Sequence, residues 1–203
     1  MAPTYKLTYF NVKGLGEAIR ILLSYGQQEF EDNRIEFDEW QKIKPSKLFQ
    51  NISLYLVSNE VRMATPFGKC PILEINGKPL HQSAAICRYL AKQFGLAGKD
   101  DWENLEIDMI TDTITDFRIG GSLLTSSVLM RPLKQESKSY IYFSVILQLT
   151  WVDIYFVGII DTLTAILKVD ILEGYPHIKA LKESVLNTPN IKAWVDKRPI
   201  TQM

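Results

Sequence analysis

The phenol of Tyr9 is the side chain with the clearest chemical potential, because it lies at the end of a predicted strand over residues 5–10. In open α/β sheets, ligands collect beyond the carboxyl ends of strands, where loops lead into helices. A phenol hydroxyl at such a place can donate a hydrogen bond to an anion held by neighbouring helix N-termini. Considered alone, however, Tyr9 is better explained as a core residue of its strand.

Residues 66–71 form a second candidate, because they lead into another strand through the Cys70–Pro71 bond. Proline is tolerated at the first position of a strand. A cis Cys70–Pro71 bond would leave the backbone of Cys70 free to pair with a peptide-like ligand. An ordinary tight turn fits the same residues, and the sequence does not decide between the two.

Helix starts and acidic side chains supply two further candidates. Ser83 follows Gln82 at the start of a predicted helix, so its hydroxyl can cap that helix or bind a ligand carboxylate near the positive end of the helix dipole. Capping is favoured when Ser83 is considered alone. Asp112 and Asp116 share one face of a later predicted helix, and a solvated acidic face is the default explanation for them.

The composition of the chain argues against several classes of function. Its 23 basic and 23 acidic residues cancel, so the chain lacks the positive field that attracts nucleic acids. The spacing of its cysteines, Cys70 and Cys87, fits neither a redox pair nor a zinc site, and its two histidines are isolated. The first residues lack the apolar run of a signal peptide. We therefore expect a cytoplasmic protein with no metal and no nucleic-acid partner.

One stretch raises the question of a membrane span. Residues 140–167 are nearly continuous in apolar side chains and are long enough to cross a bilayer. Asp153 and Asp161 interrupt the stretch, and each would cost about 2.5–3.5 kcal/mol at the middle of a membrane. We expect a buried helix in a helical bundle and no membrane association, with a membrane span as the alternative.

Two kinds of periodicity divide the chain near residues 95–100. Before this point, strand patterns at 5–10, 30–36 and 71–81 alternate with helical patterns at 17–25 and 82–93, with Asn76–Gly77 predicting a type I′ turn. After it, every clear pattern is helical, over residues 101–118, 150–168, 176–187 and 190–197. This order predicts an α/β thioredoxin-like domain over residues 1–97 and an all-helical domain over residues 98–203.

Taken together, these segments resemble the sigma-class glutathione S-transferases, above all the insect members of that class. The class also includes glutathione-dependent prostaglandin D synthase. The resemblance extends over most of the chain, and the order of the motifs is more specific than any one of them. The matching segments are residues 5–10, 17–20, 66–74, 80–83, 108–117, 149–153 and 193–199, together with Trp40.

The resemblance implies that Tyr9 holds the thiolate of bound glutathione, the co-substrate, for attack on small hydrophobic electrophiles. It also implies a homodimer in which the partner subunit offers Asp116 to the amino group of glutathione. A free thiol has a pKa of about 8.5, and one hydrogen bond to a charged group can lower it by roughly one to two units. The implied glutathione-binding residues are Tyr9, Phe10, Trp40, Lys44, Gly68, Lys69, Cys70, Gln82, Ser83 and Asp116.

The chain departs from the family pattern at several places. Leu15 replaces an arginine near the catalytic tyrosine, and Thr115 replaces one acid of a magnesium-binding cluster, so we expect no magnesium site. Residues 47–65 are an insert beside the glutathione site, and residues 119–148 differ from the segment that forms one wall of the electrophile pocket. Both blocks could come from alternative splicing or a faulty gene model.

Two alternative functions follow from these departures. One is a transferase-like binding or structural protein with weak catalysis. The other is a glutathione-dependent prostaglandin isomerase.

Overall fold

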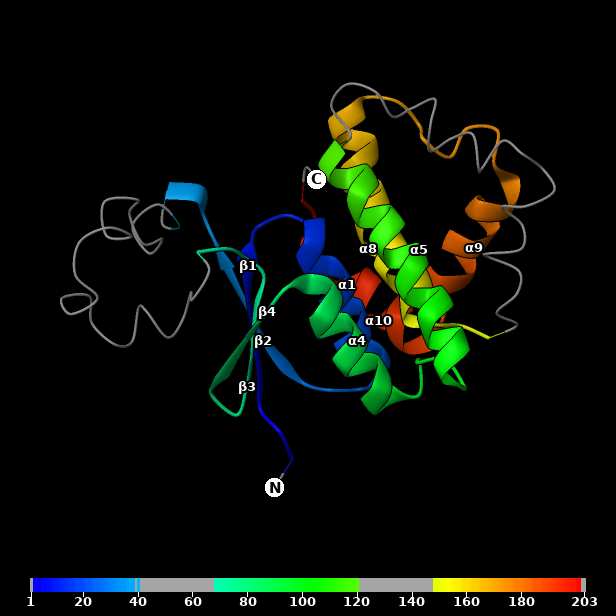
Figure 1. Ribbon diagram of the computed structural model, residues 1–203. Helices are drawn as coiled ribbons and strands as arrows, with labels where there is room; N and C mark the ends of the chain where they lie inside the picture. Colours follow the sequence, from blue (N-terminus) through cyan, green and yellow to red (C-terminus); the bar gives the residue numbers. More distant parts are fainter. Residues whose placement is uncertain (1, 39, 41–67, 121–147, 202–203) are drawn as a thin grey trace, which may run out of the picture.

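The structure is a computed structural model that describes residues 2–38, 40, 68–120 and 148–201. A four-stranded sheet with the order β2-β1-β3-β4 lies at one side of the molecule, and helices α1 and α4 separate it from the remaining helices (Figure 1). This arrangement confirms the predicted thioredoxin-like unit followed by a helical unit. The elements are β1 Tyr5–Phe10, α1 Gly14–Tyr25, β2 Phe30–Ile35, β3 Ile72–Ile75, β4 Lys78–His81, α4 Ser83–Phe94, α5 Asp101–Gly120, α8 Trp151–Leu167, α9 Pro176–Leu186 and α10 Pro189–Lys197.

The sheet forms where the sequence alternates between buried and partly exposed side chains. Along β1 every second residue is buried, as expected for a strand with one face on a core. β1 runs parallel to β2 and antiparallel to β3. Asn76 and Gly77 have φ angles of 52° and 75°, which confirms the predicted type I′ turn between β3 and β4.

The first helix begins earlier than the sequence predicted. The helical pattern begins at residue 17, yet Gly14 and Gly16 both lie in the first turn of the helix. A Cβ at Gly14 would lie 2.6 Å from the hydroxyl oxygen of Tyr9, and one at Gly16 would lie 2.5 Å from Cδ1 of the same ring. The two glycines therefore let the Tyr9 ring lie directly against the helix backbone.

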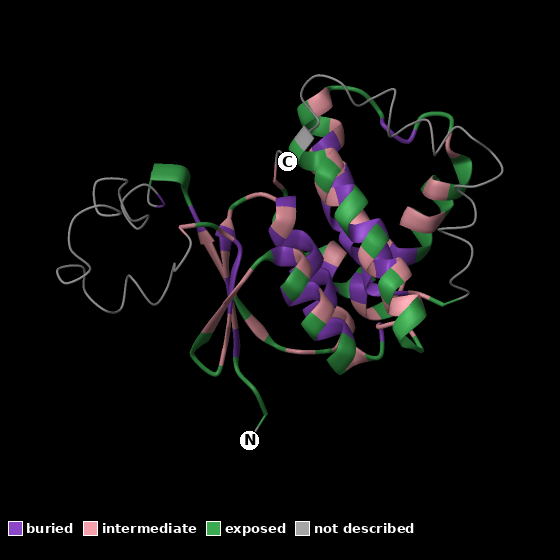
Figure 2. Ribbon diagram, viewed as in Figure 1, coloured by how far each residue is buried: buried purple, intermediate pink, exposed green. Residues whose placement is uncertain are grey.

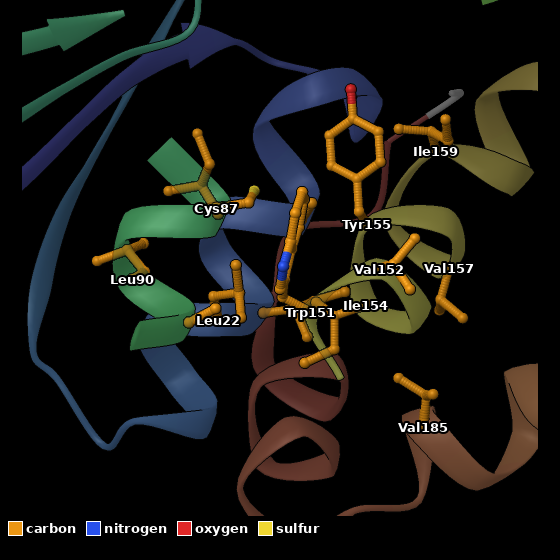
Figure 3. Close-up of a cluster of buried hydrophobic side chains, with 14 of the residues drawn as sticks. Leu22, Cys87, Leu90, Trp151, Val152, Ile154, Tyr155, Val157, Ile159 and Val185 are labelled. Carbon is orange, nitrogen blue, oxygen red and sulfur yellow. The ribbon is translucent and has the colours of Figure 1, made fainter. Parts of the chain in front are cut away.

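Helix α8 forms the centre of the core. Trp151 and Tyr155 of α8, each 1% exposed, lie close to Leu22 of α1 and Cys87 of α4 (Figure 3). Buried residues follow α1 and α8, whereas the outer side of α5 is largely exposed (Figure 2). The described part of the apolar stretch thus contains a bundle helix, Trp151–Leu167, and none of the helices among the described residues has the length and apolar character of a membrane span.

The start of α8 is fixed by a capping box formed by Thr150 and Asp153. The backbone N–H of Thr150 donates to Oδ2 of Asp153 at 2.8 Å, and the Thr150 hydroxyl donates to the same oxygen at 3.0 Å. Burial raises the pKa of Asp153, although these hydrogen bonds act in the opposite direction. The pair satisfies an amide that would otherwise be orphaned at the helix start.

A buried network of charges joins α1 to the sheet and to α10. Arg20, which is fully buried, donates to Asp32 of β2 at 2.9 Å and to Glu17 at 3.2 Å. Glu17 also accepts hydrogen bonds from the Trp194 indole at 3.0 Å and from Arg198 at 2.7 Å. Buried charges require such partners, and this network supplies them from both halves of the chain.

Candidate active site

Tyr9 lies at the carboxyl end of β1, against the first turn of α1. Its ring meets the ring of Phe10 edge-on at 5.5 Å, and the guanidinium carbon of Arg20 lies 5.9 Å from its centroid. The backbone N–H of Leu15 donates to the Tyr9 hydroxyl oxygen at 3.1 Å. Because that oxygen is the acceptor in this bond, its own proton is left to donate to a ligand.

The electrostatic surroundings keep Tyr9 in the form that can donate. Burial of the ring raises the pKa of Tyr9, although the Leu15 N–H and the charge of Arg20 act in the opposite direction. An ordinary tyrosine is already protonated at neutral pH, and the raised pKa of Tyr9 favours the protonated phenol further. Tyr9 is therefore suited to act as a hydrogen-bond donor to an anion, and not as a base.

Aromatic side chains extend from Tyr9 along the same edge of the sheet. The Phe10 ring meets the Trp40 ring edge-on at 5.9 Å, and Trp40 is buried. Phe37, which the sequence analysis did not select, lies 6.1 Å from Phe10 and is largely exposed. The structure thus brings Tyr9, Phe10 and Trp40 together, with Phe37 on their outer side.

The residues before β3 reach the same edge. β1 and β3 pair with Thr8 opposite Ile72, and continuing this register places Cys70 level with Phe10. The Cys70–Pro71 bond is cis, which is one of the two conformations that the sequence left open. Gly68 has a φ of 57°, and Lys69 is exposed. Gly68, Lys69 and Cys70 therefore lie close to the end of β1.

Gln82 and Ser83 join this group from the end of β4. β4 ends at His81, opposite Ile72, so the next two residues leave the sheet near Cys70. Ser83 does not cap its own helix, which corrects the interpretation that the sequence favoured for this residue alone. The capping position belongs to Gln82, whose φ is 70°, and the buried Ser83 hydroxyl lies 3.4 Å from the hydroxyl of Tyr155.

The positive φ of Gln82 is informative about function. Left-handed conformations are unfavourable for residues other than glycine, and they are enriched at ligand sites. Gln82 is also exposed, so core packing does not explain its conformation. Gln82 lies just beyond the end of β4, near Cys70, and an exposed residue held in this way is typical of a binding site.

Comparison with known proteins identifies the family of this site. A model of the glutathione S-transferase N-terminal domain matches residues 5–92, and a model of the C-terminal domain matches residues 126–198. A glutathione S-transferase of Anopheles gambiae is 38% identical, with the match covering 99% of this chain and all of that protein. The chain belongs to the glutathione S-transferase family.

Two further relatives narrow the position of this transferase within the family. Hematopoietic prostaglandin D synthase of Rattus norvegicus is 36% identical, over 99% of this chain and 100% of that protein. The structure of prostaglandin synthase D of Nilaparvata lugens has a TM-score of 0.73 and 40% identity, over 98% of this chain and 100% of that one. Insect transferases and prostaglandin D synthases are the two groups that the sequence motifs resembled.

The remaining predicted site residues of the transferase lie apart from this edge or outside the described residues. Asp116 is exposed on α5, and no contact described for it reaches the Tyr9 group within one chain. Asp108, on the same helix, accepts a hydrogen bond from Arg88 of α4 at 2.8 Å, so the acidic face is partly neutralised. Lys44, the insert 47–65 and most of the segment 119–148 lie outside the described residues.

The thiols of the transferase are poor candidates for the nucleophile. Burial raises the pKa of Cys70 to about 12, and it also raises the pKa of Cys87. Thiolate is the reactive form of cysteine, so neither residue is activated at neutral pH. Across the residues that the structure describes, no three side chains of metal-binding type come together.

Sequence reasoning missed the contacts that hold the loop between β1 and α1. The Gly14 N–H donates to the hydroxyl oxygen of Thr162 at 3.0 Å. Lys13 donates to Asp161 at 2.8 Å, and Lys182 pairs with the same carboxylate. Partial burial favours the neutral acid, but the hydrogen bonds from both lysines outweigh it and hold the pKa of Asp161 below its usual value. In the sequence, Asp161 stands out only as a charge inside an apolar stretch.

Proposed function

We propose that this transferase conjugates glutathione to small hydrophobic electrophiles, with Tyr9 donating a hydrogen bond to the glutathione thiolate. The observation that carries the proposal is the Tyr9 hydroxyl, which accepts the Leu15 N–H at 3.1 Å and retains its proton. A protonated phenol at the end of a strand is placed to stabilise an anion without removing a proton itself. The thiolate sulfur then forms a bond to the electrophilic carbon, and the leaving group departs with its electron pair.

The other residues at this edge take roles in holding the tripeptide. The backbone of Cys70 would pair with the cysteinyl part of glutathione, as an extended peptide adds to an exposed strand edge. Ser83 and Gln82 would bind the γ-glutamyl carboxylate beside the first turn of α4, whose free amides favour a negative charge. Phe10 and Trp40 would line the site with Gly68 and Lys69, and Lys44, which lies outside the described residues, would complete it. The proposal also includes two domains, a glutathione-binding thioredoxin-like domain over residues 1–97 and an all-helical domain over residues 98–203.

Glutathione affinity tests the binding half of the proposal. Replacing Ser83 with alanine should weaken glutathione binding about 10-fold or more, because a hydrogen bond to a charged group contributes about 1.5–3 kcal/mol. Isothermal titration calorimetry measures the change. Ser24→Ala is the matched control, since the Ser24 hydroxyl donates to the carbonyl of Arg20 within its own helix. Equal affinity of both variants for glutathione would refute the role of Ser83.

A homodimer is part of the same proposal, because Asp116 would be offered by the partner subunit. Asp116 shares the outer face of α5 with three apolar side chains, Trp102, Leu105 and Met109, which are 70%, 49% and 47% exposed. Residues three and four apart on a helix share one face. A second copy of the chain packed on this face would cover the apolar side chains and bring its own Asp116 towards the first site.

A charge on this face should separate the subunits. Met109→Glu is expected to convert the dimer to a monomer, measured by light scattering, because the carboxylate would be buried without a partner. Glutathione binding should weaken at the same time, since Asp116 of the partner is lost. Val169→Glu places the same charge on another exposed apolar residue and should leave the dimer intact. A dimeric Met109→Glu protein would exclude α5 from the interface.

Prostaglandin isomerisation is the second candidate function, favoured by the relatives named prostaglandin D synthase. Leu15 supplies no charge where many sigma-class enzymes carry an arginine, which favours conjugation. Measuring the turnover of prostaglandin H2 and of a chlorodinitrobenzene substrate distinguishes isomerisation from conjugation. Retention on immobilised glutathione without turnover of either would favour the binding-protein alternative.

Both cysteines are free thiols, in keeping with a cytoplasmic location.

A further inference from the structure

Helix α8 approaches the start of α1 more closely than side chains normally permit. A Cβ at Gly158 would lie 2.7 Å from the backbone nitrogen of Ala18, so the two helices touch backbone to backbone there. One turn further along α8, Asp161 and Thr162 reach the loop that leads from Tyr9 into α1. The Gly158 contact therefore fixes the position of this part of α8 relative to α1 and the loop.

Two hydrogen bonds join α8 to this loop. Thr162 accepts the Gly14 N–H at 3.0 Å, and Asp161 accepts a hydrogen bond from Lys13 at 2.8 Å. Asp161 is itself held by Lys182 of α9. Both bonds join residues that are 148 positions apart in the sequence. The loop is thus fixed by side chains from the other half of the chain.

The geometry points to Thr162 as a positioning residue for Tyr9, and we propose that role for it. Gly14 has a φ of 44° and no side chain, so the chain at this point has little intrinsic preference for one orientation. The amide on one side of Gly14 is held by Thr162, and the next amide, that of Leu15, donates to the Tyr9 hydroxyl. By fixing the first amide, Thr162 keeps the second on the phenol oxygen.

The inference rests on the proposed function, because it concerns how strongly Tyr9 stabilises a thiolate. A hydrogen bond accepted by the phenol oxygen polarises its O–H bond and makes it a stronger donor, as in other chains of hydrogen bonds. When the Leu15 N–H moves away, the phenol remains in place but donates more weakly. The thiol of bound glutathione should then ionise at higher pH.

Thr162→Val tests this role because valine has nearly the same shape but no acceptor. The pKa of the bound glutathione thiol, followed by the ultraviolet absorbance of the thiolate, should rise by about half a unit to one unit. The value of kcat/KM near pH 6.5 should fall about three- to tenfold and recover as the pH rises. The KM for glutathione should change little, since Thr162 is not among the residues proposed to hold the tripeptide.

Two further variants separate this role from a general loss of structure. Thr162→Ser retains the acceptor and should restore the wild-type pH profile. Thr164→Val makes the same replacement two residues away, about 200° around the helix, and should leave the profile unchanged. If Thr162→Val fails to fold, Thr162→Ala, which adds no atoms, carries the same expectation.

The outcomes distinguish this inference from the proposed function. A raised thiol pKa in Tyr9→Phe together with a wild-type pKa in Thr162→Val would overturn the role of Thr162 and leave that of Tyr9. A Thr162→Ser variant that behaves like Thr162→Val would also overturn it. An unchanged thiol pKa in Tyr9→Phe would instead refute the proposed role of Tyr9.

Discussion

Replacing Tyr9 with phenylalanine is expected to lower kcat/KM for glutathione conjugation about 10- to 100-fold near pH 6.5. The phenyl ring can keep its place beside Phe10 and Arg20, but the donor to the thiolate is lost. A hydrogen bond to a charged group contributes about 1.5–3 kcal/mol, which is the source of this range. Steady-state kinetics with a chlorodinitrobenzene substrate measure the effect.

The loss of activity in Tyr9→Phe should depend on pH in a definite direction. Without the phenol, the thiol of bound glutathione should return towards the value of about 8.5 typical of a free thiol. The deficit of Tyr9→Phe should therefore be largest at low pH and shrink as the pH rises through that value. Tyr89→Phe removes a half-exposed phenol on α4 and serves as the control. A Tyr9→Phe enzyme that keeps full activity near pH 6.5 would show that Tyr9 does not act in this way.

Replacing Glu17 with glutamine should lower the free energy of unfolding by about 3–5 kcal/mol, the largest stability effect that we expect. Glu17 is 2% exposed and accepts hydrogen bonds from Arg20, Trp194 and Arg198. Glutamine has nearly the same shape, but it leaves the fully buried charge of Arg20 with Asp32 as its remaining acidic partner in the described network. Urea denaturation of the purified protein measures the change.

The control for Glu17 is an ion pair on the surface. Glu31 pairs with Lys6 at 3.0 Å, with side chains 62% and 40% exposed, and such pairs contribute about 0–1 kcal/mol. Glu31→Gln should therefore change the free energy of unfolding by less than about 1 kcal/mol. If both variants were equally stable, the buried network would contribute no more than a surface pair.

Much of the fold could be predicted because local sequence determines it. The alternation of β1, the Asn76–Gly77 turn and the capping box at Thr150 and Asp153 each involve residues only a few positions apart. The start of α1 could not be predicted in this way. Gly14 and Gly16 are poor helix formers by propensity, and they belong to the helix because the Tyr9 ring occupies the space that a Cβ would need.

The candidate site also contains some residues that the sequence predicts and others that it does not. Tyr9 and Ser83 could be selected because their residue types and their positions at element ends suggest chemistry. The Leu15 N–H could not, because a backbone amide carries no signature in the sequence. Thr162 was missed because its role depends on how α8 packs against α1, which a helical periodicity does not determine.

The bonds to Glu17 also join the first helix to the last helix that the ribosome makes. Trp194 and Arg198 lie 177 and 181 positions after Glu17. Domains tend to fold in order as they are synthesised, but here the first helix receives two of its donors only after almost the whole chain has emerged. Until then Glu17 lacks two of the three side chains, Trp194 and Arg198, that donate to it in the folded structure. The thioredoxin-like half therefore cannot complete this buried network until α10 and Arg198 have been synthesised.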